Sequence, residues 1–334
     1  MSSSAETSAA RRIPTFADVL AAAERLAGQA VRTPLVRSDV LDALTGGRVF
    51  LKAECLQRTG SFKFRGAFNA ISQVPEAMRA KGIVACSSGN HAQGVAEAAR
   101  LLGFPATILM PSDAPAIKRM RTERSGATVV TYDRATEDRE ERTAALIAET
   151  GAELVHPYDD ARVMAGQGTA ALEAFEDLAG RGIVPEVVLV CASGGGLTAG
   201  TALATEARAP AATIYAVEPD GFDDLGRSLA TGERQRNSRT SGSLCDALLT
   251  PSPGELTFEI NRRLVKAGLA VTDEEALRAV AFAANELKLV VEPGGAVALA
   301  ALLSGKLDIA GKTVVALLSG GNIEPEIYVR ALKG

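Results

Sequence analysis

The chain has 334 residues, of which 47% are hydrophobic and 23% charged, a composition typical of a globular protein with one large domain or two ordinary ones. Its formal net charge of −4, without a basic run, argues against a nucleic-acid-binding surface, and no stretch of about 18 apolar residues is present to span a membrane. The polar start MSSSAETSAARR lacks the apolar segment of a secretory signal and is expected to be a floppy tail.

Histidine and cysteine usage bounds the chemistry. Only two histidines are present, His91 and His156, so a three-histidine metal site is excluded and a catalytic base of another residue type is expected. The four cysteines lie far apart without a C-x-x-C pair, which is typical of reduced thiols in a cytoplasmic protein. They are Cys55, Cys86, Cys191 and Cys245.

Short apolar or β-branched runs alternate along the chain with Ala-rich stretches of helical character. This rhythm predicts an α/β protein with open, mostly parallel, twisted sheets covered by helices on both faces. The segment 231–243 is the most loop-like interior piece. Strands are expected, in chain order, at 49–52, 82–86, 106–111, 127–132, 186–191, 213–219 and from 313 onward, with helices at 91–103, 140–151 and 168–180.

The first stretch of chemical interest is TGSFKFRGA, at 59–67, where Lys63 lies between Phe62 and Phe64. Two interpretations are open. Lys63 and Arg65 could form the solvated face of a helix, or Lys63 could be a desolvated, reactive amine. Burial lowers the pKa of an amine, and the neutral amine is the form that attacks an aldehyde.

Three polar turns follow predicted strands, at the strand ends where parallel sheets bind ligands. The turn Ser-Gly-Gly-Gly-Leu at 193–197 presents unobstructed N–H groups at a helix start, as a phosphate site requires, although a merely tight turn is the alternative. The turn Ser-Ser-Gly-Asn-His at 87–91 either suits a carboxylate or is a plain serine N-cap. The turn Ser-Gly-Gly-Asn at 319–322 is similar and could be a plain turn.

A lysine, a phosphate site and a carboxylate-binding turn, without a catalytic histidine, together point to pyridoxal phosphate, whose aldehyde forms a Schiff base with a lysine. The stretches GSFKFRGA, SSGNHAQGVA, HPYDDARVMAGQGT, SGGGLTAG, VEPDGFDD, VVEPGGAVALAAL and LSGGN occur in this order. Through them, from about residue 30 to 325, the chain resembles the fold-type II pyridoxal-phosphate enzymes (tryptophan synthase β-like), specifically the threonine/serine dehydratase and serine racemase group.

The resemblance implies a large cofactor-binding domain (1–81 and 156–334), a small mobile domain (82–155) that closes on the substrate, and a homodimer. It implies that Lys63 carries the cofactor and removes the substrate α-proton, and that Ser88 lies on the opposite face, where racemases use a second acid or base. The other expected cofactor contacts are Phe62, Asn90, Ser193, Gly194, Gly195, Gly196, Leu197 and Ser319. The substrate carboxylate is expected at Ser87, Ser88, Gly89, Asn90 and His91.

The resemblance also implies a site for Mg²⁺ or Ca²⁺ made by Glu218, Asp224 and the backbone carbonyl of Phe222, because such cations prefer oxygen ligands. The alternative is a solvated acidic turn at a strand end. Two further roles are open. Arg139 either faces the substrate or is an exposed residue of a Glu-rich helix start, and Glu292 is expected near the cofactor ring.

The chain departs from the family pattern at two positions. Ser193 stands where relatives often have the first of four glycines in the phosphate loop, so the loop geometry is open and the hydroxyl could add a contact. Ala247 follows Asp246 where relatives often have glycine, and its methyl group is expected to trim the pocket.

The expected activity is a dehydratase that converts L-threonine or L-serine to a 2-oxo acid and ammonia, by removal of the α-proton and loss of the β-hydroxyl. The chain ends soon after LSGGN, so no regulatory domain is expected. A serine racemase is one alternative, which Ser88 permits. A 3-hydroxyaspartate dehydratase is another, and it would need an additional cation for the side-chain carboxylate. A non-catalytic nucleotide-binding module is disfavoured by Lys63.

Overall fold

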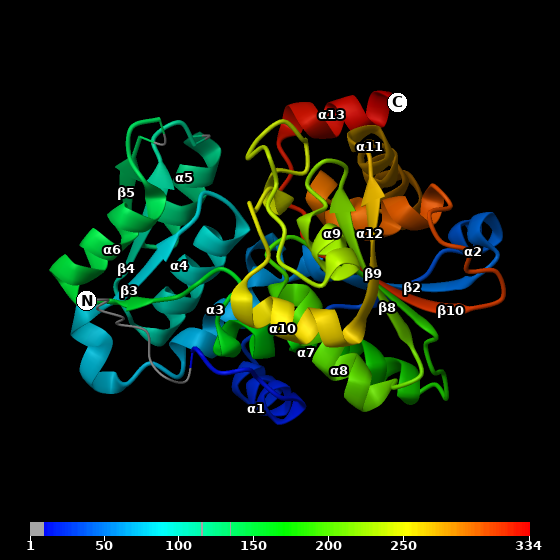
Figure 1. Ribbon diagram of the computed structural model, residues 1–334, viewed down its shortest axis with the longest axis horizontal. Coiled ribbons are helices and arrows are strands. Elements are labelled where there is room, and N and C mark those ends of the chain that lie inside the picture. Colours follow the sequence, from blue (N-terminus) through cyan, green and yellow to red (C-terminus); the bar gives the residue numbers. More distant parts are fainter. Residues whose placement is uncertain (1–9, 115, 134) are drawn as a thin grey trace.

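The computed structural model describes residues 10–114, 116–133 and 135–334. They form two sheets surrounded by helices, with the smaller sheet on the left of Figure 1 and the larger on the right. Parallel pairing dominates both sheets, so the predicted α/β class with mostly parallel sheets is confirmed.

The larger sheet has six strands in the order β1-β2-β10-β7-β8-β9, and only β1 and β2 pair antiparallel. Its central strands β7 and β10 are buried on both faces, which explains their near-continuous apolar sequences. The bounds are β1 (Leu35–Val36), β2 (Arg48–Ala53), β7 (Val187–Cys191), β8 (Thr213–Pro219), β9 (Val265–Val271) and β10 (Thr313–Leu318).

Alternate residues of the central strand β7 enter different cores. Val187 and Leu189 pack in the core that contains α12 (Pro293–Leu303), whereas Val188 and Val190 pack in the core of α7 (Ala161–Ala179) and α8 (Gly196–Arg208). The period of two follows from strand geometry. The helix α12 is apolar around its whole circumference because it is buried throughout.

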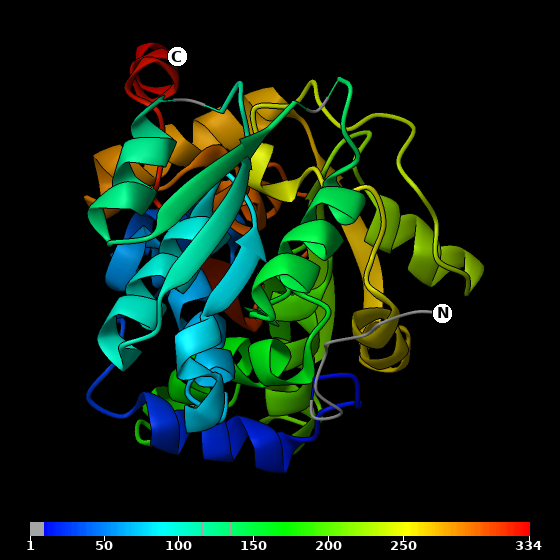
Figure 2. The same cartoon turned by 90° about the vertical axis from the view of Figure 1, so that its left-hand side faces the viewer.

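The smaller sheet has four parallel strands in the order β5-β4-β3-β6, and it faces the viewer in Figure 2. All of them fall within the expected small domain, 82–155; that this unit moves as a domain stays a prediction. The elements are β3 (Ile83–Cys86), α4 (Asn90–Leu102), β4 (Ala106–Pro111), α5 (Ala116–Arg124), β5 (Thr128–Tyr132), α6 (Arg139–Thr150) and β6 (Glu153–Leu154).

The helix α3 (Lys63–Ile71) lies between the two parts of the molecule, packed against α4 on one side and α7 on the other. No helix within the described residues combines the length and apolarity needed to cross a bilayer. The other α-helices are α1 (Phe16–Leu26), α2 (Asp39–Thr45), α9 (Asp224–Thr231), α10 (Glu255–Leu264), α11 (Asp273–Phe282) and α13 (Pro325–Lys333).

Each strand expected from the sequence is present, and so are the three expected helices. The sequence reading missed the short edge strands β1 and β6 and also β9, whose sequence VKAGLAV lacks a run of β-branched residues. The three polar turns follow β3, β7 and β10, at the carboxyl ends of their strands.

Candidate active site

Lys63 is the first residue of α3, at the junction between the two sheets. Its Nζ donates a hydrogen bond to the carbonyl of Pro157 at 2.8 Å and lies 5.2 Å from the centroid of the Phe62 ring. Burial of the amine lowers the pKa of Lys63 to about 8. The alternative of a solvated face is wrong, because Arg65 is fully buried and Lys63 is half-buried.

Arg65 belongs to a buried ionic network beside the lysine. Its guanidinium binds Glu54 through two hydrogen bonds of 2.8 Å and Glu173 through bonds of 2.7 and 2.8 Å. Lys52 completes the network with a bond of 2.7 Å to Glu173. The two positive and two negative charges balance one another, as buried charges require.

The glycine loop leads directly from β7 into the N-terminus of α8. A Cβ atom on Gly194 would lie 2.4 Å from the Tyr158 ring, so only glycine fits there. Gly195 has φ 90°, a left-handed conformation that glycine adopts without strain. The first N–H groups of α8 lack intrahelical partners and lie at the positive end of the helix dipole, so the loop suits an anion.

Side chains that the sequence reading missed hold this loop in place. Thr257 Oγ1 donates to the carbonyl of Gly194 at 2.7 Å, and Asn261 Nδ2 donates to the carbonyl of Gly195 at 3.1 Å. Ser193 Oγ donates to Thr250 Oγ1 at 2.6 Å, so this hydroxyl braces the loop. Both Thr257 and Asn261 lie on α10, and no motif in the sequence marks them.

The turn at 87–91 joins β3 to α4. The N-cap of α4 is Gly89, without a side-chain cap, so the alternative of a serine N-cap is wrong. Ser87, Ser88, Gly89 and Asn90 are half-buried, and Ser87 Oγ accepts a hydrogen bond from the N–H of Gly89 at 3.2 Å. The turn therefore places two hydroxyl groups at the positive end of a helix.

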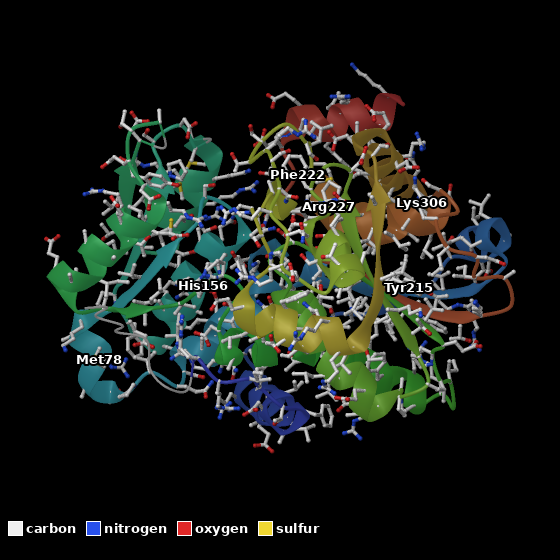
Figure 3. The ribbon with its side chains drawn as sticks, viewed as in Figure 1. Met78, His156, Tyr215, Phe222, Arg227 and Lys306 are labelled. Atoms are coloured by element: carbon white, nitrogen blue, oxygen red, sulfur yellow. The ribbon has the colours of Figure 1, made fainter. Side chains whose placement is uncertain are left out.

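Neither histidine is suited to act as a base. His91 is buried with Nε2 2.9 Å from the Val155 carbonyl, and burial lowers its pKa to about 3. His156 lies between the two sheets in Figure 3, and its Nδ1 accepts hydrogen bonds from the N–H groups of Tyr158 and Asp159 at 3.3 and 2.8 Å. Burial lowers the pKa of His156 to about 4. Both are neutral structural residues near pH 7.

Asn90 reaches from α4 to two residues of the larger part. Its Nδ2 donates to Glu292 Oε1 at 2.6 Å, and its Oδ1 accepts from Asn322 Nδ2 at 2.7 Å. Burial raises the pKa of Glu292 to about 7. Ser319 is buried nearby, and its N–H donates to the carbonyl of Gly295 at 3.2 Å. The expected residues Asn90, Glu292 and Ser319 thus come from different elements to one region.

Arg139 begins α6, and its side chain is 48% exposed. Burial dominates the pKa shifts of Cys86, His156 and Tyr158, and the positive charge of Arg139 lowers the pKa of all three. The guanidinium lies 4.0 Å from Glu140 Oε1, beyond hydrogen-bonding distance. The charge of Arg139 therefore acts on His156 and Tyr158, the two neighbours of the Pro157 whose carbonyl binds Lys63.

Glu218 and Asp224 are both fully buried at the carboxyl end of β8 and the start of α9. Glu218 accepts hydrogen bonds from the N–H groups of Leu225 and Gly226 at 3.1 and 2.8 Å. Burial, followed by the charge of Asp224, raises the pKa of Glu218 well above its usual range. The alternative of a solvated acidic turn is therefore wrong for these two residues.

Asp224 accepts from Asn237 Nδ2 at 2.6 Å through Oδ1, whereas its Oδ2 is buried without a hydrogen-bond partner among the described residues. Burial raises the pKa of Asp224 to about 7. No group of three or more His, Cys, Asp or Glu side chains in the described ranges could hold a metal, so a cation here would also need carbonyl or water oxygens. Phe222, labelled in Figure 3, is buried in the loop between Glu218 and Asp224.

The residues at the junction fit pyridoxal phosphate on structural grounds. The glycine loop at the N-terminus of α8 offers N–H groups without intrahelical partners, as a phosphate requires, and Lys63 offers an amine whose pKa is already lowered. Ala247, at the second departure from the family pattern, is exposed.

Comparisons with known proteins agree with this reading. Residues 26–320 match the family model described as pyridoxal-phosphate dependent enzyme. The chain is 48% identical to an L-threo-3-hydroxyaspartate ammonia-lyase from a Pseudomonas species, over 97% of this chain and 100% of the relative. It is 41% identical to the L-threonine ammonia-lyase of Thermotoga maritima, over 95% of this chain and 78% of that protein.

The structure also resembles solved ones. Maize serine racemase superposes with a TM-score of 0.90 at 35% identity, over 96% of this chain and 98% of that chain. The resemblance found in the sequence is therefore confirmed, as are the fold type and the dependence on pyridoxal phosphate. The chain belongs to the pyridoxal-phosphate-dependent enzyme family, in the group that contains the ammonia-lyases and serine racemases.

Proposed function

We propose that the protein is an ammonia-lyase that converts L-threo-3-hydroxyaspartate to a 2-oxo acid and ammonia. The observation that carries this choice is the exposed guanidinium of Arg139 at the start of α6, whose charge lowers the pKa of His156 and Tyr158 and offers a cation for the second carboxylate of this substrate. The name of the Pseudomonas relative, which is 48% identical, supports the same substrate. This proposal replaces the expected preference for L-threonine or L-serine, and it assigns Arg139 as the additional cation that the 3-hydroxyaspartate alternative requires.

In this proposal the glycine loop, Ser193 to Leu197, holds the phosphate through backbone N–H groups, and Lys63 holds the aldehyde carbon. Phe62, Asn90 and Ser319 surround the ring. When bound, pyridoxal phosphate supplies an electron sink for the α-carbon of the substrate. Ser319 is a neutral partner for the ring nitrogen, so the sink is milder than with an acidic residue, which favours elimination of a β-substituent.

Lys63 is the proposed base at the substrate α-carbon. Its amine has a pKa of about 8, close to the pH at which a base both exists in its neutral form and accepts a proton well. The hydrogen bond from Lys63 Nζ to Pro157 O holds the amine in one position. The buried network around Arg65 fixes α3, the helix that carries Lys63. The β-hydroxyl leaves with a proton as water, which gives an enamine. The enamine tautomerises to an imine, and hydrolysis of the imine gives the 2-oxo acid and ammonia.

The turn from Ser87 to His91 is the proposed site of the α-carboxylate. It lies at the N-terminus of α4, where the helix dipole and the N–H groups favour an anion. Arg139 approaches from α6 and would bind the side-chain carboxylate. Arginine suits this role because its planar guanidinium can form two parallel hydrogen bonds with a carboxylate.

Steady-state kinetics of Arg139→Met test the proposal, with release of 2-oxo acid followed from L-threo-3-hydroxyaspartate, L-threonine and L-serine. Arg142→Met is the matched control, because Arg142 lies on the same helix, is similarly exposed at 44%, and pairs with Glu137 at 3.0 Å. The wild type should prefer hydroxyaspartate. Arg139→Met should lower kcat/KM for that substrate by about 10–200-fold, with little change for L-threonine. Equal losses for both substrates would contradict the assignment.

L-Threonine or L-serine is the second candidate substrate, supported by the 41% identity to the Thermotoga threonine ammonia-lyase. In that case the wild type prefers L-threonine, and Arg139→Met changes no substrate preference. Serine racemization is a third candidate activity, because Ser88 lies in the turn proposed to bind the substrate. D-Serine formation that Ser88→Ala abolishes, with 2-oxo acid release retained, would establish it.

The remaining expectations accompany this proposal. Glu218, Asp224 and the carbonyl of Phe222 would bind Mg²⁺ or Ca²⁺, which fits the unpartnered Oδ2 of Asp224. The chain is also proposed to form a homodimer in the cytoplasm, and its unit at 82–155 to close on the substrate.

A further inference from the structure

Asn322 lies in the turn after β10, and none of the roles above uses it. Its Nδ2 donates two hydrogen bonds, to the carbonyl of Thr59 at 2.8 Å and to Asn90 Oδ1 at 2.7 Å. Its Oδ1 lies 3.5 Å from Arg121 Nη1, on the opposite side. These three neighbours fix which end of the Asn322 carboxamide faces the site, because both hydrogens of Nδ2 have acceptors.

The orientation of Asn90 follows from that of Asn322. Because Asn322 donates to Asn90 Oδ1, the amide group of Asn90 must point the other way, where one of its two hydrogens binds Glu292 Oε1 at 2.6 Å. A flipped Asn90 would present its NH₂ group to the NH₂ group of Asn322 and its oxygen to a carboxyl oxygen of Glu292. Both contacts are unfavourable when Glu292 is ionised, so the second N–H of Asn90 has a fixed direction.

The loop before Lys63 is shaped around Asn322. Thr59 has φ 63°, a left-handed conformation that is uncommon outside glycine. At Gly60 a Cβ atom would lie 2.8 Å from Asn322 Oδ1, so a side chain there would displace the carboxamide. The N–H of Gly321 also donates to the carbonyl of Gly60 at 2.8 Å. The turn of Asn322 and the loop of Lys63 are therefore built as one unit.

We propose that Asn322 is a positioning residue that holds the Asn90 carboxamide so that its second N–H meets the ring hydroxyl of the cofactor. The inference rests on the proposed function, which assigns Asn90 to the cofactor. A hydrogen bond at the ring oxygen influences whether the shared proton lies on that oxygen or on the Schiff-base nitrogen. Asn322 therefore acts on the electronic state of the cofactor without touching it.

The test combines Asn322→Asp, Asn322→Ala, Asn90→Ala and the double variant Asn90→Ala/Asn322→Ala. Asn322→Asp keeps the shape of the side chain and removes both donated hydrogen bonds. For each protein the affinity for pyridoxal phosphate and the absorbance spectrum of the bound cofactor are measured, with thermal unfolding as a check on folding. Asn285→Ala is the control, because Asn285 is exposed and lies outside both the turn of Asn322 and the loop before Lys63.

We expect Asn322→Asp to weaken cofactor binding by about tenfold and to change the ratio of the two absorbing forms of the cofactor. In the double variant the loss should equal that of Asn90→Ala alone, because Asn322 has nothing left to position. Additive losses, or an unchanged spectrum in Asn322→Asp, would overturn the inference. If the wild type itself forms no absorbing complex with pyridoxal phosphate, the proposed function fails first, and that result is recognised without any variant.

Discussion

The guanidinium of Arg65 donates two hydrogen bonds of 2.8 Å to the carboxylate of Glu54, and both side chains are fully buried. Arg65 lies two residues after Lys63 on α3, and the same guanidinium binds Glu173 on α7. The pair therefore fixes the helix that presents the reactive lysine, and it does so with charges that cannot be left alone in the interior.

Arg65→Met should destabilise the protein by about 3–5 kcal/mol, because it leaves Glu54 and Glu173 with only Lys52 as a positive partner. Urea unfolding of the purified protein measures this change. Arg181→Met, at an exposed arginine, is the control and should alter the free energy of unfolding by no more than about 0.5 kcal/mol. Equal stabilities of the two variants would show that the buried network does not hold α3.

Gly194→Ala should weaken binding of pyridoxal phosphate by at least about tenfold, because the new Cβ would lie 2.4 Å from the Tyr158 ring and would move the loop. The dissociation constant is measured by titrating the apoenzyme with the cofactor. The control is Gly180→Ala at the end of α7, where φ is −60° and a Cβ atom would be no closer than 3.5 Å to its neighbours. A normal affinity in Gly194→Ala would place the phosphate elsewhere.

The lowered pKa of Lys63 predicts a pH dependence for cofactor loading. Burial lowers this pKa from 10.5 to about 8, so the neutral amine dominates above about pH 8. The rate constant for incorporation of pyridoxal phosphate into the apoenzyme should rise with pH and level off near 8. The control is the reaction of Nα-acetyl-lysine, which has a free ε-amine, with the cofactor in solution. The rate of that reaction should keep rising toward pH 10. If the loading rate of the apoenzyme shows the same pH dependence as this control, Lys63 is solvated.

The lowered pKa of Lys63 also predicts how the free energy of unfolding of the apoenzyme changes with pH. Between about pH 8 and 10.5 the unfolded chain keeps a proton on Lys63 that the folded chain has released. The unfolded state then binds more protons, so the contribution of Lys63 to stability increases as pH rises through this window. Lys63→Met should remove this part of the pH dependence, which thermal unfolding at several pH values can show.

Divalent cations should stabilise the protein through Glu218 and Asp224. At a Ca²⁺ or Mg²⁺ concentration about 100 times the dissociation constant, the gain is about 2.7 kcal/mol, which appears as a higher Tm. Asp224→Asn should abolish most of this response, whereas Asp220→Asn, at an exposed neighbour, should retain it. If neither cation changes the Tm of the wild type, Glu218 and Asp224 bind no divalent cation and have only a structural role.

The central strands and the glycine turns could be predicted from the sequence because their signals are local. Val187 to Cys191 is a continuous apolar run, and Gly194 to Gly196 begins three residues after its end. The resemblance to the family added Lys63, Asn90 and Ser319 to the predicted site. The structure brings these three residues to one junction from three distant segments.

The supporting contacts could not be predicted, because they depend on packing between distant elements. The sequence around Thr257 and Asn261 indicates only a helix. Their hydrogen bonds to the glycine loop become evident only when the fold brings α10 next to that loop. Pro157 was part of a matched stretch, but only the fold shows that its carbonyl binds Lys63. Asn237 lies in the segment interpreted as a loop, and its contact with Asp224 crosses 13 residues of sequence.

Lys63 is the residue proposed to bind pyridoxal phosphate covalently, and every other proposed role at the site depends on this bond. Borohydride reduction of the cofactor-loaded protein, followed by peptide mass spectrometry, tests this directly. Lys63→Ala and Lys266→Ala, the latter at an exposed lysine on β9, are analysed in parallel. The predicted result is a single pyridoxyl-modified peptide that contains Lys63, present in Lys266→Ala and absent in Lys63→Ala. Modification of another lysine, or of none, in the wild type would contradict the account.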